Sequence, residues 1–203
     1  MSKLSIKPVW LLAFCLWIGL VAGSYAWLLR YSFAAGDTSA VPCTIPPSLL
    51  SPGTPARPQL LLALHPRCPC SRATVKELAK ILTHAPNACN VTALMYRPAG
   101  EPDNWLDGAL LDACRRMNCQ VRPDPDGRLA GLVGSLTSGN VVLYDASGKL
   151  RYHGGITSSR GHEGDNAGER AVIQILRGNR DSQKSMPVFG CPIRPETTRQ
   201  DSL

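Results

Sequence analysis

The stretch "LHPRCPCSRATVKELAKIL", residues 64–82, decides the fold that the sequence predicts. Cys68 and Cys70 flank a single proline, and apolar residues at helical spacing follow them. The apolar run before the pair, "PQLLLALHP" at 58–66, has proline near both ends and suits a short buried strand. A cysteine pair between a buried strand and a helix could be a redox dithiol, a metal clamp or a structural staple, and these residues alone leave all three roles open.

The position of the two cysteines favours a reactive thiol. A thiolate at a helix start lies at the positive end of the helix dipole, and the neighbouring Arg67 adds positive charge. Both features lower the pKa of a thiol and make it more reactive. Pro69 stiffens the short ring that a disulfide between Cys68 and Cys70 would close. Because a strained disulfide is easily reduced, we expect a relatively oxidising redox couple.

The remaining pattern predicts alternating strands and helices. The predicted strands occupy residues 58–66, 90–96, 140–145 and 149–154. The predicted helices occupy residues 71–82, 105–117 and 166–177, with Ser71 and Asn166 as N-caps. The segment "RPDPDGR" at 122–128 is expected to be a turn. This order predicts an α/β fold with a mixed four-stranded sheet and flanking helices.

An apolar segment without charged residues, "PVWLLAFCLWIGLVAGSYAWLL" at 8–29, is long enough to cross a membrane as a helix. Lys3 and Lys7 precede it, so the positive-inside rule places residues 1–7 in the cytoplasm and the C-terminal domain in the periplasm or outside the cell. A cleaved signal peptide is the alternative. The apolar run continues past the small residues that a cleavage site would use, which favours an uncleaved anchor.

Composition divides the rest of the chain into three parts. Residues 30–57 are rich in proline, serine and glycine and are expected to form a tether. Residues 58–178 hold the predicted strands and helices and form the expected domain. Residues 179–203 are expected to be a polar tail with one short apolar, cysteine-containing knot, "MPVFGCPI".

A strand, a cysteine pair at a helix start, a βαβ unit and a final ββα unit together resemble a thioredoxin-like domain. With the anchor, the chain is similar to the exported, tethered thioredoxins of the TlpA and ResA type. It most closely resembles RedB-like proteins in "HPRCPCSR", "SLTSGNVVLYDASGKLRYHGGITSSRGHEGDNAGE" and "VFGCPI".

The resemblance implies thiol–disulfide exchange outside the cytoplasm. Carried over by position, Cys68 would be the attacking thiol and Cys70 the resolving thiol. Two departures from the family pattern are visible. The pair is one residue shorter than Cys-x-x-Cys, and Gly139 stands where the family normally has a cis-proline that faces the dithiol. Glycine can adopt unusual backbone angles, so the loop can keep its shape.

Seven of the eight cysteines follow the apolar segment, so at least one thiol in an exported domain stays free, binds a ligand or pairs with another molecule. Cys114 and Cys119 could form a local disulfide. Cys43 and Cys191 lie in the two flanking segments and could join the tether to the tail. Sequence alone does not give the connectivity.

The expected thiol–disulfide oxidoreductase needs no cofactor, and the main alternative to it is a protein that binds or delivers copper. Cys-Pro-Cys thiolates suit Cu(I), and His162, His65 or His153 could supply a third ligand. His162 lies in "RGHEGDNAGE", 160–169, which is better explained as a loop that leads into a helix capped by Asn166. A third alternative is a binding module that keeps the fold without redox chemistry.

The net charge of +7 is spread along the chain, and aromatic residues make up only 6% of it. Nucleic-acid binding is therefore not expected. The expected partners are the thiols or disulfides of exported proteins, together with a membrane protein that delivers electrons.

Overall fold

The computed structural model describes residues 8–50, 57–179 and 181–193, and the chain divides into two compact units, Met1–Ala34 and Ala35–Leu203. The first unit contains α1 (Pro8–Ser32), a helix that begins where the sequence predicts and has no buried residue. By length and composition α1 could cross a membrane, and an N-terminal signal sequence would meet the same criteria. The predicted cytoplasmic segment, residues 1–7, lies outside the described residues.

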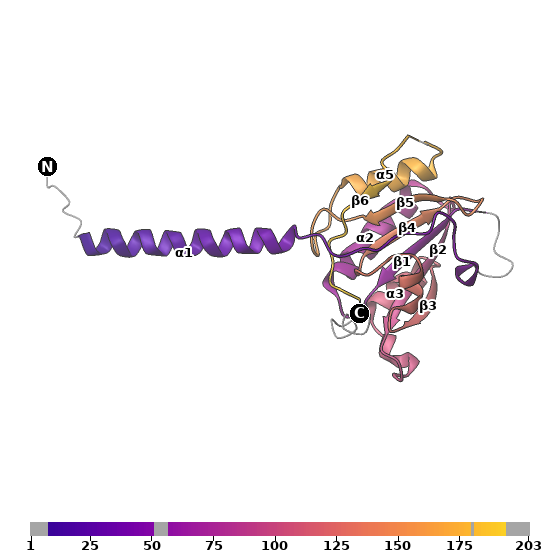
Figure 1. Ribbon diagram of the computed structural model, residues 1–203, viewed down its shortest axis with the longest axis horizontal. Helices are drawn as coiled ribbons and strands as arrows, with labels where there is room; N and C mark the ends of the chain where they lie inside the picture. The colour runs from indigo at the N-terminus through magenta and orange to yellow at the C-terminus, as the bar shows by residue number, and fades with distance from the viewer. Residues whose placement is uncertain (1–7, 51–56, 180, 194–203) are drawn as a thin grey trace. The chain divides into compact units, whose positions relative to one another are not determined.

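The second unit is built on one six-stranded mixed sheet. Its strands are β1 (Gln59–Leu64), β2 (Asn90–Arg97), β3 (Gln120–Pro125), β4 (Asn140–Tyr144), β5 (Leu150–Gly155) and β6 (Ser185–Met186). Their order in the sheet is β3-β2-β1-β4-β5-β6 (Figure 1). β1, β2 and β3 are parallel, β4 is antiparallel to both β1 and β5, and β6 is parallel to β5.

The four predicted strands form the centre of this sheet, and two short strands that the sequence analysis did not predict lie at its edges. β3 includes part of the segment expected to be a turn. Pro123 and Pro125 have no N–H group to donate to a neighbouring strand, so β3 cannot form a full set of hydrogen bonds on both of its sides. This agrees with its position at an edge of the sheet. β6 lies in the predicted tail and pairs through His153 with Ser185 and Gly154 with Met186.

Alternate residues of β1 face two separate cores. Leu60, Leu62 and Leu64 pack on one side of the sheet, whereas Leu61 and Ala63 pack on the other side. The first side is covered by α2 (Pro69–His84), α3 (Ala109–Arg116) and α5 (Ala167–Leu176), and the second by α4 (Arg128–Leu132) and the 3-10 turn η1 (Pro47–Leu49). Cover on both faces explains why β1 is apolar throughout rather than alternating.

The predicted helix over 105–117 is divided in the structure. It consists of a 3-10 turn, η2 (Asp103–Leu106), and of α3, with Gly108 between them. Gly108 has φ 149°, a backbone conformation that favours glycine and interrupts the helix.

The flanking segments differ from the expected tether and tail, because both pack on the domain. In the first segment Ile45 and Leu49 are buried, and the Ile45 N–H donates to the Gly148 carbonyl at 2.9 Å. The Gly36 N–H donates to the carbonyl of Val188, which joins the two segments at 2.8 Å. The parts of the predicted tether at 51–56 and of the predicted tail at 180 and 194–203 lie outside the described residues.

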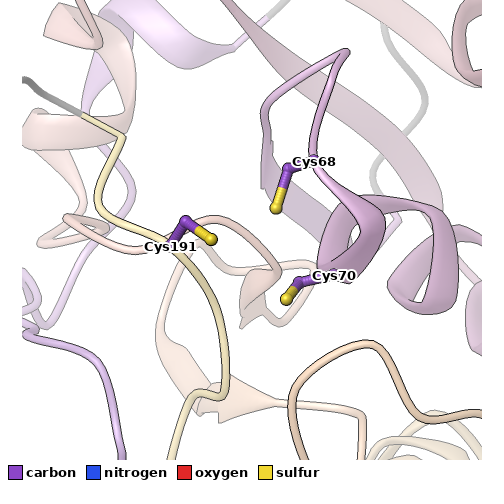
Figure 2. A group of neighbouring side chains, drawn as sticks. All are labelled: Cys68, Cys70 and Cys191. Carbon is purple, nitrogen blue, oxygen red and sulfur yellow. The ribbon is translucent and has the colours of Figure 1, made fainter. Parts of the chain in front are cut away.

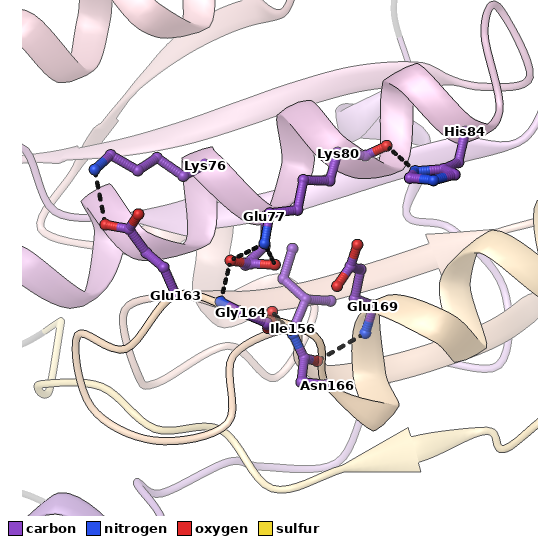
Figure 3. A network of polar contacts seen from close by, with 9 residues as sticks. All are labelled: Lys76, Glu77, Lys80, His84, Ile156, Glu163, Gly164, Asn166 and Glu169. Carbon is purple, nitrogen blue, oxygen red and sulfur yellow. Dashed lines mark hydrogen bonds and ion pairs between the residues drawn. The ribbon is translucent and has the colours of Figure 1, made fainter.

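A buried carboxylate network joins α2 to the loop that precedes α5 (Figure 3). Glu77 is fully buried, forms an ion pair with Lys80 at 3.1 Å and accepts the Gly164 N–H at 2.8 Å. Asn166 Oδ1 accepts the Glu169 N–H at 2.9 Å, which confirms Asn166 as the N-cap of α5. The loop at 160–169 therefore has a structural role in leading the chain into α5.

Replacing Glu169 with glutamine is expected to stabilise the protein at pH 8. Burial, and next the neighbouring Glu77 carboxylate, raise the pKa of Glu169, so the folded state loses stability as pH rises and this group ionises. Glutamine does not ionise and avoids that loss. We expect the Tm of Glu169→Gln to exceed that of the wild type by about 2 to 4 °C at pH 8, and the difference to vanish near pH 4.

Thermal unfolding of the full chain in detergent at the two pH values measures this effect. Glu163→Gln is the matched control, because Glu163 is an exposed carboxylate of the same loop and pairs with the exposed Lys76. A Tm difference for Glu169→Gln that is the same at pH 4 and pH 8 would contradict the role assigned to ionisation.

Candidate redox site

The cysteine pair lies at the start of α2, as the sequence predicts, but the N-cap lies three residues earlier than expected. Cys68 is the N-cap, with φ −98° and ψ 127°, and Pro69 is the first helical residue. Proline is favoured at this position because its φ is fixed near the helical value and the first N–H has no partner in the helix. Ser71, the predicted cap, instead accepts the His65 N–H at 2.9 Å and so fixes the loop after β1.

Cys68 is buried, with 5% of its surface exposed. Its pKa is lowered to about 4, chiefly by a hydrogen bond from the Cys70 thiol. The Ser138 hydroxyl, 3.3 Å from the sulfur, and the N–H groups of Ser71 and Cys70 lower the pKa further, and burial opposes them. Cys68 is therefore a thiolate at neutral pH, as the helix-start argument predicted.

Cys70 has the opposite character. It is also buried, and its pKa is raised because its thiol donates a hydrogen bond to Cys68 and because burial disfavours its thiolate. The Gly161 N–H hydrogen-bonds to the Cys70 sulfur and opposes this rise. The pair thus combines one thiolate with one protonated thiol, which is the arrangement that an attacking and a resolving cysteine require.

A third cysteine, Cys191, lies beside this pair (Figure 2). The sulfur atoms of Cys68, Cys70 and Cys191 all lie within 4.8 Å of one another. The Cys191 N–H donates to Ser138 Oγ at 3.2 Å, and the Ser138 N–H donates to the Cys191 carbonyl at 2.8 Å. The sequence analysis missed this placement, and its only signal was the odd number of exported cysteines.

The predicted bridge between Cys43 and Cys191 does not fit this geometry. Cys43 is exposed, and its carbonyl accepts the N–H of Leu150, which pairs with the last residue of β4. Cys191 is hydrogen-bonded to Ser138, and Ser138 lies two residues before the start of β4. At about 3.4 Å per residue, the length of β4 separates the two cysteines, which is too far for a disulfide.

Cys114 and Cys119 lie together at the end of α3. Both are buried, and the Cys119 N–H donates to the Cys114 carbonyl at 3.0 Å. A hydrogen bond between the thiols lowers the pKa of Cys114 and raises that of Cys119. All eight cysteines are reduced in the structure, so a local disulfide between these two stays a prediction.

The supporting residues have mixed outcomes. Gly139 has φ 87°, and an added Cβ would lie 2.7 Å from Thr74 Oγ1, so glycine is required in the loop before β4. The guanidinium of Arg67, an exposed residue, lies 4.5 Å from the centre of the Trp105 ring, a cation–π contact. The expected effect of Arg67 on the pKa of Cys68 stays a prediction.

His162 is not brought into the site. It is exposed, and its Nδ1 lies 3.3 Å from the Arg160 carbonyl oxygen. Among the described residues, the third potential metal ligand beside Cys68 and Cys70 is Cys191, so the predicted ligand set with His162 is corrected.

Replacing Ser138 with alanine is expected to raise the pKa of Cys68 above about 4, because the thiolate loses a hydrogen-bond donor. The rate of iodoacetamide alkylation of Cys68, followed against pH by peptide mass spectrometry, measures the pKa. Ser135→Ala is the matched control, since Ser135 is a buried serine near Ser138 that accepts from the Asn140 side chain. Equal shifts in the two variants would mean that repacking, rather than the hydroxyl of Ser138, sets the pKa.

Comparison with known proteins supports the fold and leaves the activity open. No family model and no curated protein matches the chain. A hypothetical protein from Sinorhizobium meliloti 1021 aligns with a TM-score of 0.53 and 19% identity, covering 80% of this chain and 95% of its own. An uncharacterised conserved protein from Geobacillus kaustophilus aligns with a TM-score of 0.56 and 15% identity, covering 81% and 95%.

A secreted Mycobacterium tuberculosis disulfide oxidoreductase, described as homologous to E. coli DsbE, aligns at a TM-score of 0.43 with 16% identity, covering 74% of this chain and 98% of its own. The two alignments with TM-scores above 0.5 are informative about the fold, and none of the three is informative about activity. In the chain itself, β1, α2 and β2 form a βαβ unit, and β4, β5 and α5 complete the sheet and its cover. The chain therefore has a thioredoxin-like α/β fold with a candidate N-terminal transmembrane helix.

Proposed function

We propose that the chain is a membrane-anchored thiol–disulfide oxidoreductase that acts outside the cytoplasm through its Cys-Pro-Cys pair. The observation that carries this proposal is the pairing of Cys68, held at the N-terminus of α2, with Cys70 as its hydrogen-bond donor. The lowered pKa of Cys68 supports an attacking role for this thiol, and the raised pKa of Cys70 supports a resolving role.

The exchange has two balanced steps. The Cys68 thiolate attacks one sulfur of a substrate disulfide, forms a mixed disulfide and releases the other substrate sulfur as a thiolate. Cys70 then loses its proton, attacks the Cys68 sulfur and releases the second substrate thiolate, so the substrate gains two electrons and the protein pair loses two. A membrane dithiol donor would restore the reduced pair, and the same steps run in reverse oxidise substrate thiols.

The environment of Cys68 favours the oxidising direction. A thiolate that is stabilised in the folded protein stabilises the reduced form of the pair, and this raises the reduction potential. We expect a potential more positive than the about −270 mV of thioredoxin. This agrees with the sequence argument that a disulfide across one proline is strained.

The proposed location rests on the N-terminal sequence. α1 has no charged residue before Arg30, and Lys3 and Lys7 precede it. Under the positive-inside rule the domain would face the periplasm or the cell exterior, where its substrates would be exported protein thiols or disulfides. The resemblance to RedB-like proteins in the segments quoted above supports the same location.

The test is the reduction potential of the full chain in detergent, titrated in glutathione buffers and followed by alkylation and peptide mass spectrometry. A reversible two-electron couple that involves Cys68 supports the proposal, and its value separates an oxidant from a reductant. If Cys68 stays reduced, or oxidises irreversibly, across the whole range of buffers, the proposal is wrong.

A second candidate function is Cu(I) binding, and the convergence of three sulfurs favours it specifically. Thiolates are the ligands that soft Cu(I) prefers, and the sulfurs of Cys68, Cys70 and Cys191 are close enough to share one ion. Competition with a chromophoric Cu(I) chelator would test this function. Cu(I) binding that weakens in Cys191→Ser and is unchanged in His162→Ala would support it, and no competition by the wild type would exclude it.

A further inference from the structure

The C-terminal segment at 187–193 lies along the loop that precedes β4 and carries Cys191 to the cysteine pair. Ser138 and Cys191 exchange two hydrogen bonds, at 2.8 and 3.2 Å. Two residues further on, the Ile193 N–H donates to the Leu136 carbonyl at 2.9 Å. These contacts resemble the way in which an extended peptide is bound along the edge of a sheet, by main-chain hydrogen bonds and by anchored side chains.

This segment is fixed on both sides of Cys191. Before it, β6 pairs with β5, and Val188 is buried with 2% of its surface exposed. After it, Ile193 is buried with 3% exposed. Gly190 approaches so closely that an added Cβ would lie 1.9 Å from the Ser138 carbonyl oxygen. The position of Cys191 is therefore set by the fold and does not depend on a free tail.

Ser138 ties Cys191 directly to the attacking thiol. Its hydroxyl lies 3.3 Å from Cys68 Sγ and also accepts the Cys191 N–H at 3.2 Å. The two sulfurs lie within 4.8 Å, and a disulfide bond of about 2.05 Å would need the sulfurs to approach by less than about 3 Å. We expect rotation of the two side chains to supply this approach.

We infer that Cys191 is a third redox thiol, which forms a disulfide with Cys68, and that the segment at 187–193 acts as an internal peptide substrate. This inference rests on the proposed function. Cys191 would then be a second resolving thiol besides Cys70, and it lies near the opposite end of the domain sequence.

The step balances in the same way as resolution by Cys70. Cys191 loses its proton to solvent, and its thiolate attacks the Cys68 sulfur of a mixed disulfide. The bond between Cys68 and the substrate breaks, the substrate sulfur leaves as a thiolate, and a Cys68–Cys191 disulfide forms. Cys70 can then lose its proton to solvent, attack the same Cys68 sulfur, release Cys191 as a thiolate and transfer the disulfide to the Cys68–Cys70 pair without any external oxidant.

A consequence concerns the trapping of substrates. With a single resolving thiol, Cys70→Ser alone would accumulate mixed disulfides on Cys68. With two resolving thiols, only the double variant Cys70→Ser, Cys191→Ser accumulates them, because each single variant keeps one thiol that can attack Cys68.

Peptide mapping of the full chain in detergent tests the inference directly. The protein is reduced, treated with oxidised glutathione, quenched in acid with an alkylating reagent and digested with trypsin. Residues 68–72 and 185–199 are separate tryptic peptides, since proline follows Arg194. A disulfide to Cys191 joins these two peptides, whereas a Cys68–Cys70 disulfide stays within the first.

Cys70→Ser is the decisive variant, because any cross-link between the two peptides must then join Cys68 to Cys191. We expect this cross-link to replace the glutathione adduct on Cys68 in Cys70→Ser, and the adduct to persist in the double variant Cys70→Ser, Cys191→Ser. Cys43→Ser combined with Cys70→Ser is the matched control and is expected to keep the cross-link, because Cys43 is an exposed cysteine at the other end of β4.

The two proposals fail in different ways. If Cys70→Ser keeps glutathione on Cys68 and gives no cross-link, while the wild type still forms a reversible Cys68–Cys70 disulfide, the role of Cys191 is wrong and the proposed function stands. If the wild type forms neither a disulfide nor a glutathione adduct at Cys68, the proposed function is itself wrong, and the inference falls with it.

Discussion

Replacing Cys68 with serine is expected to lower the rate of thiol–disulfide exchange by at least about 1000-fold, as removal of a nucleophile does in other enzymes. Cys68 is the thiol whose hydrogen bonds stabilise its thiolate, and a serine hydroxyl in its place stays protonated and does not attack disulfides. The rate of catalysed exchange with a fluorescent glutathione disulfide, measured on the full chain in detergent, quantifies this loss.

Cys43→Ser is the matched control for this loss, because it removes an exposed thiol that is remote from the site. Its rate is expected to equal that of the wild type. Activity that survives in Cys68→Ser would mean that another thiol attacks the substrate. The hydrogen bond from Cys70 to Cys68 would then have no role in activating the attacking thiol.

The part of the site that could be predicted from the sequence depends on local contacts. Cys68, Pro69 and Cys70 are neighbours in the chain, and a proline that can only start a helix places them at its N-terminus. The alternation of apolar strands and amphipathic helices likewise predicts the central four strands and three of the helices. The pKa of Cys68 follows mainly from this local geometry.

The part that could not be predicted depends on contacts between distant residues. Cys191 reaches the site because its backbone is hydrogen-bonded to Ser138, 53 residues earlier. Arg67 lies over the ring of Trp105, a contact between residues far apart in the chain. The edge strands β3 and β6 have little periodic pattern, and only pairing with β2 and β5 makes them strands. The proline, serine and glycine content of residues 30–57 predicted a tether. Parts of this segment are nevertheless held on the domain by main-chain hydrogen bonds, which composition does not reveal.

The hydrogen bond from Cys70 is the largest of the contacts that lower the pKa of Cys68. Replacing Cys70 with alanine removes that donor and is expected to raise the pKa of Cys68 from about 4 towards the ordinary value of about 8.5. Thiolate fraction and thiolate nucleophilicity then change in opposite directions, because a less acidic thiol gives a stronger nucleophile.

The two effects predict alkylation profiles that cross. At pH 5 the full shift lowers the thiolate fraction by about 3000-fold and raises the nucleophilicity by about 100-fold, so Cys70→Ala should react about 30-fold more slowly than the wild type. At pH 8 about a quarter of the variant is thiolate, and it should react about 25-fold faster. The profiles should cross near about pH 6.5.

The rate of iodoacetamide addition to Cys68, read from the peptide of residues 68–72, measures both profiles, and Cys43→Ala serves as the control that should follow the wild type. A crossing assigns the low pKa to the bond between the two thiols. A variant that keeps the wild-type profile would instead assign it to Ser138 and to the N–H groups of the first turn of α2, which alanine leaves in place. In that case Cys70 would act in resolution alone, since the thiolate at Cys68 would form without it.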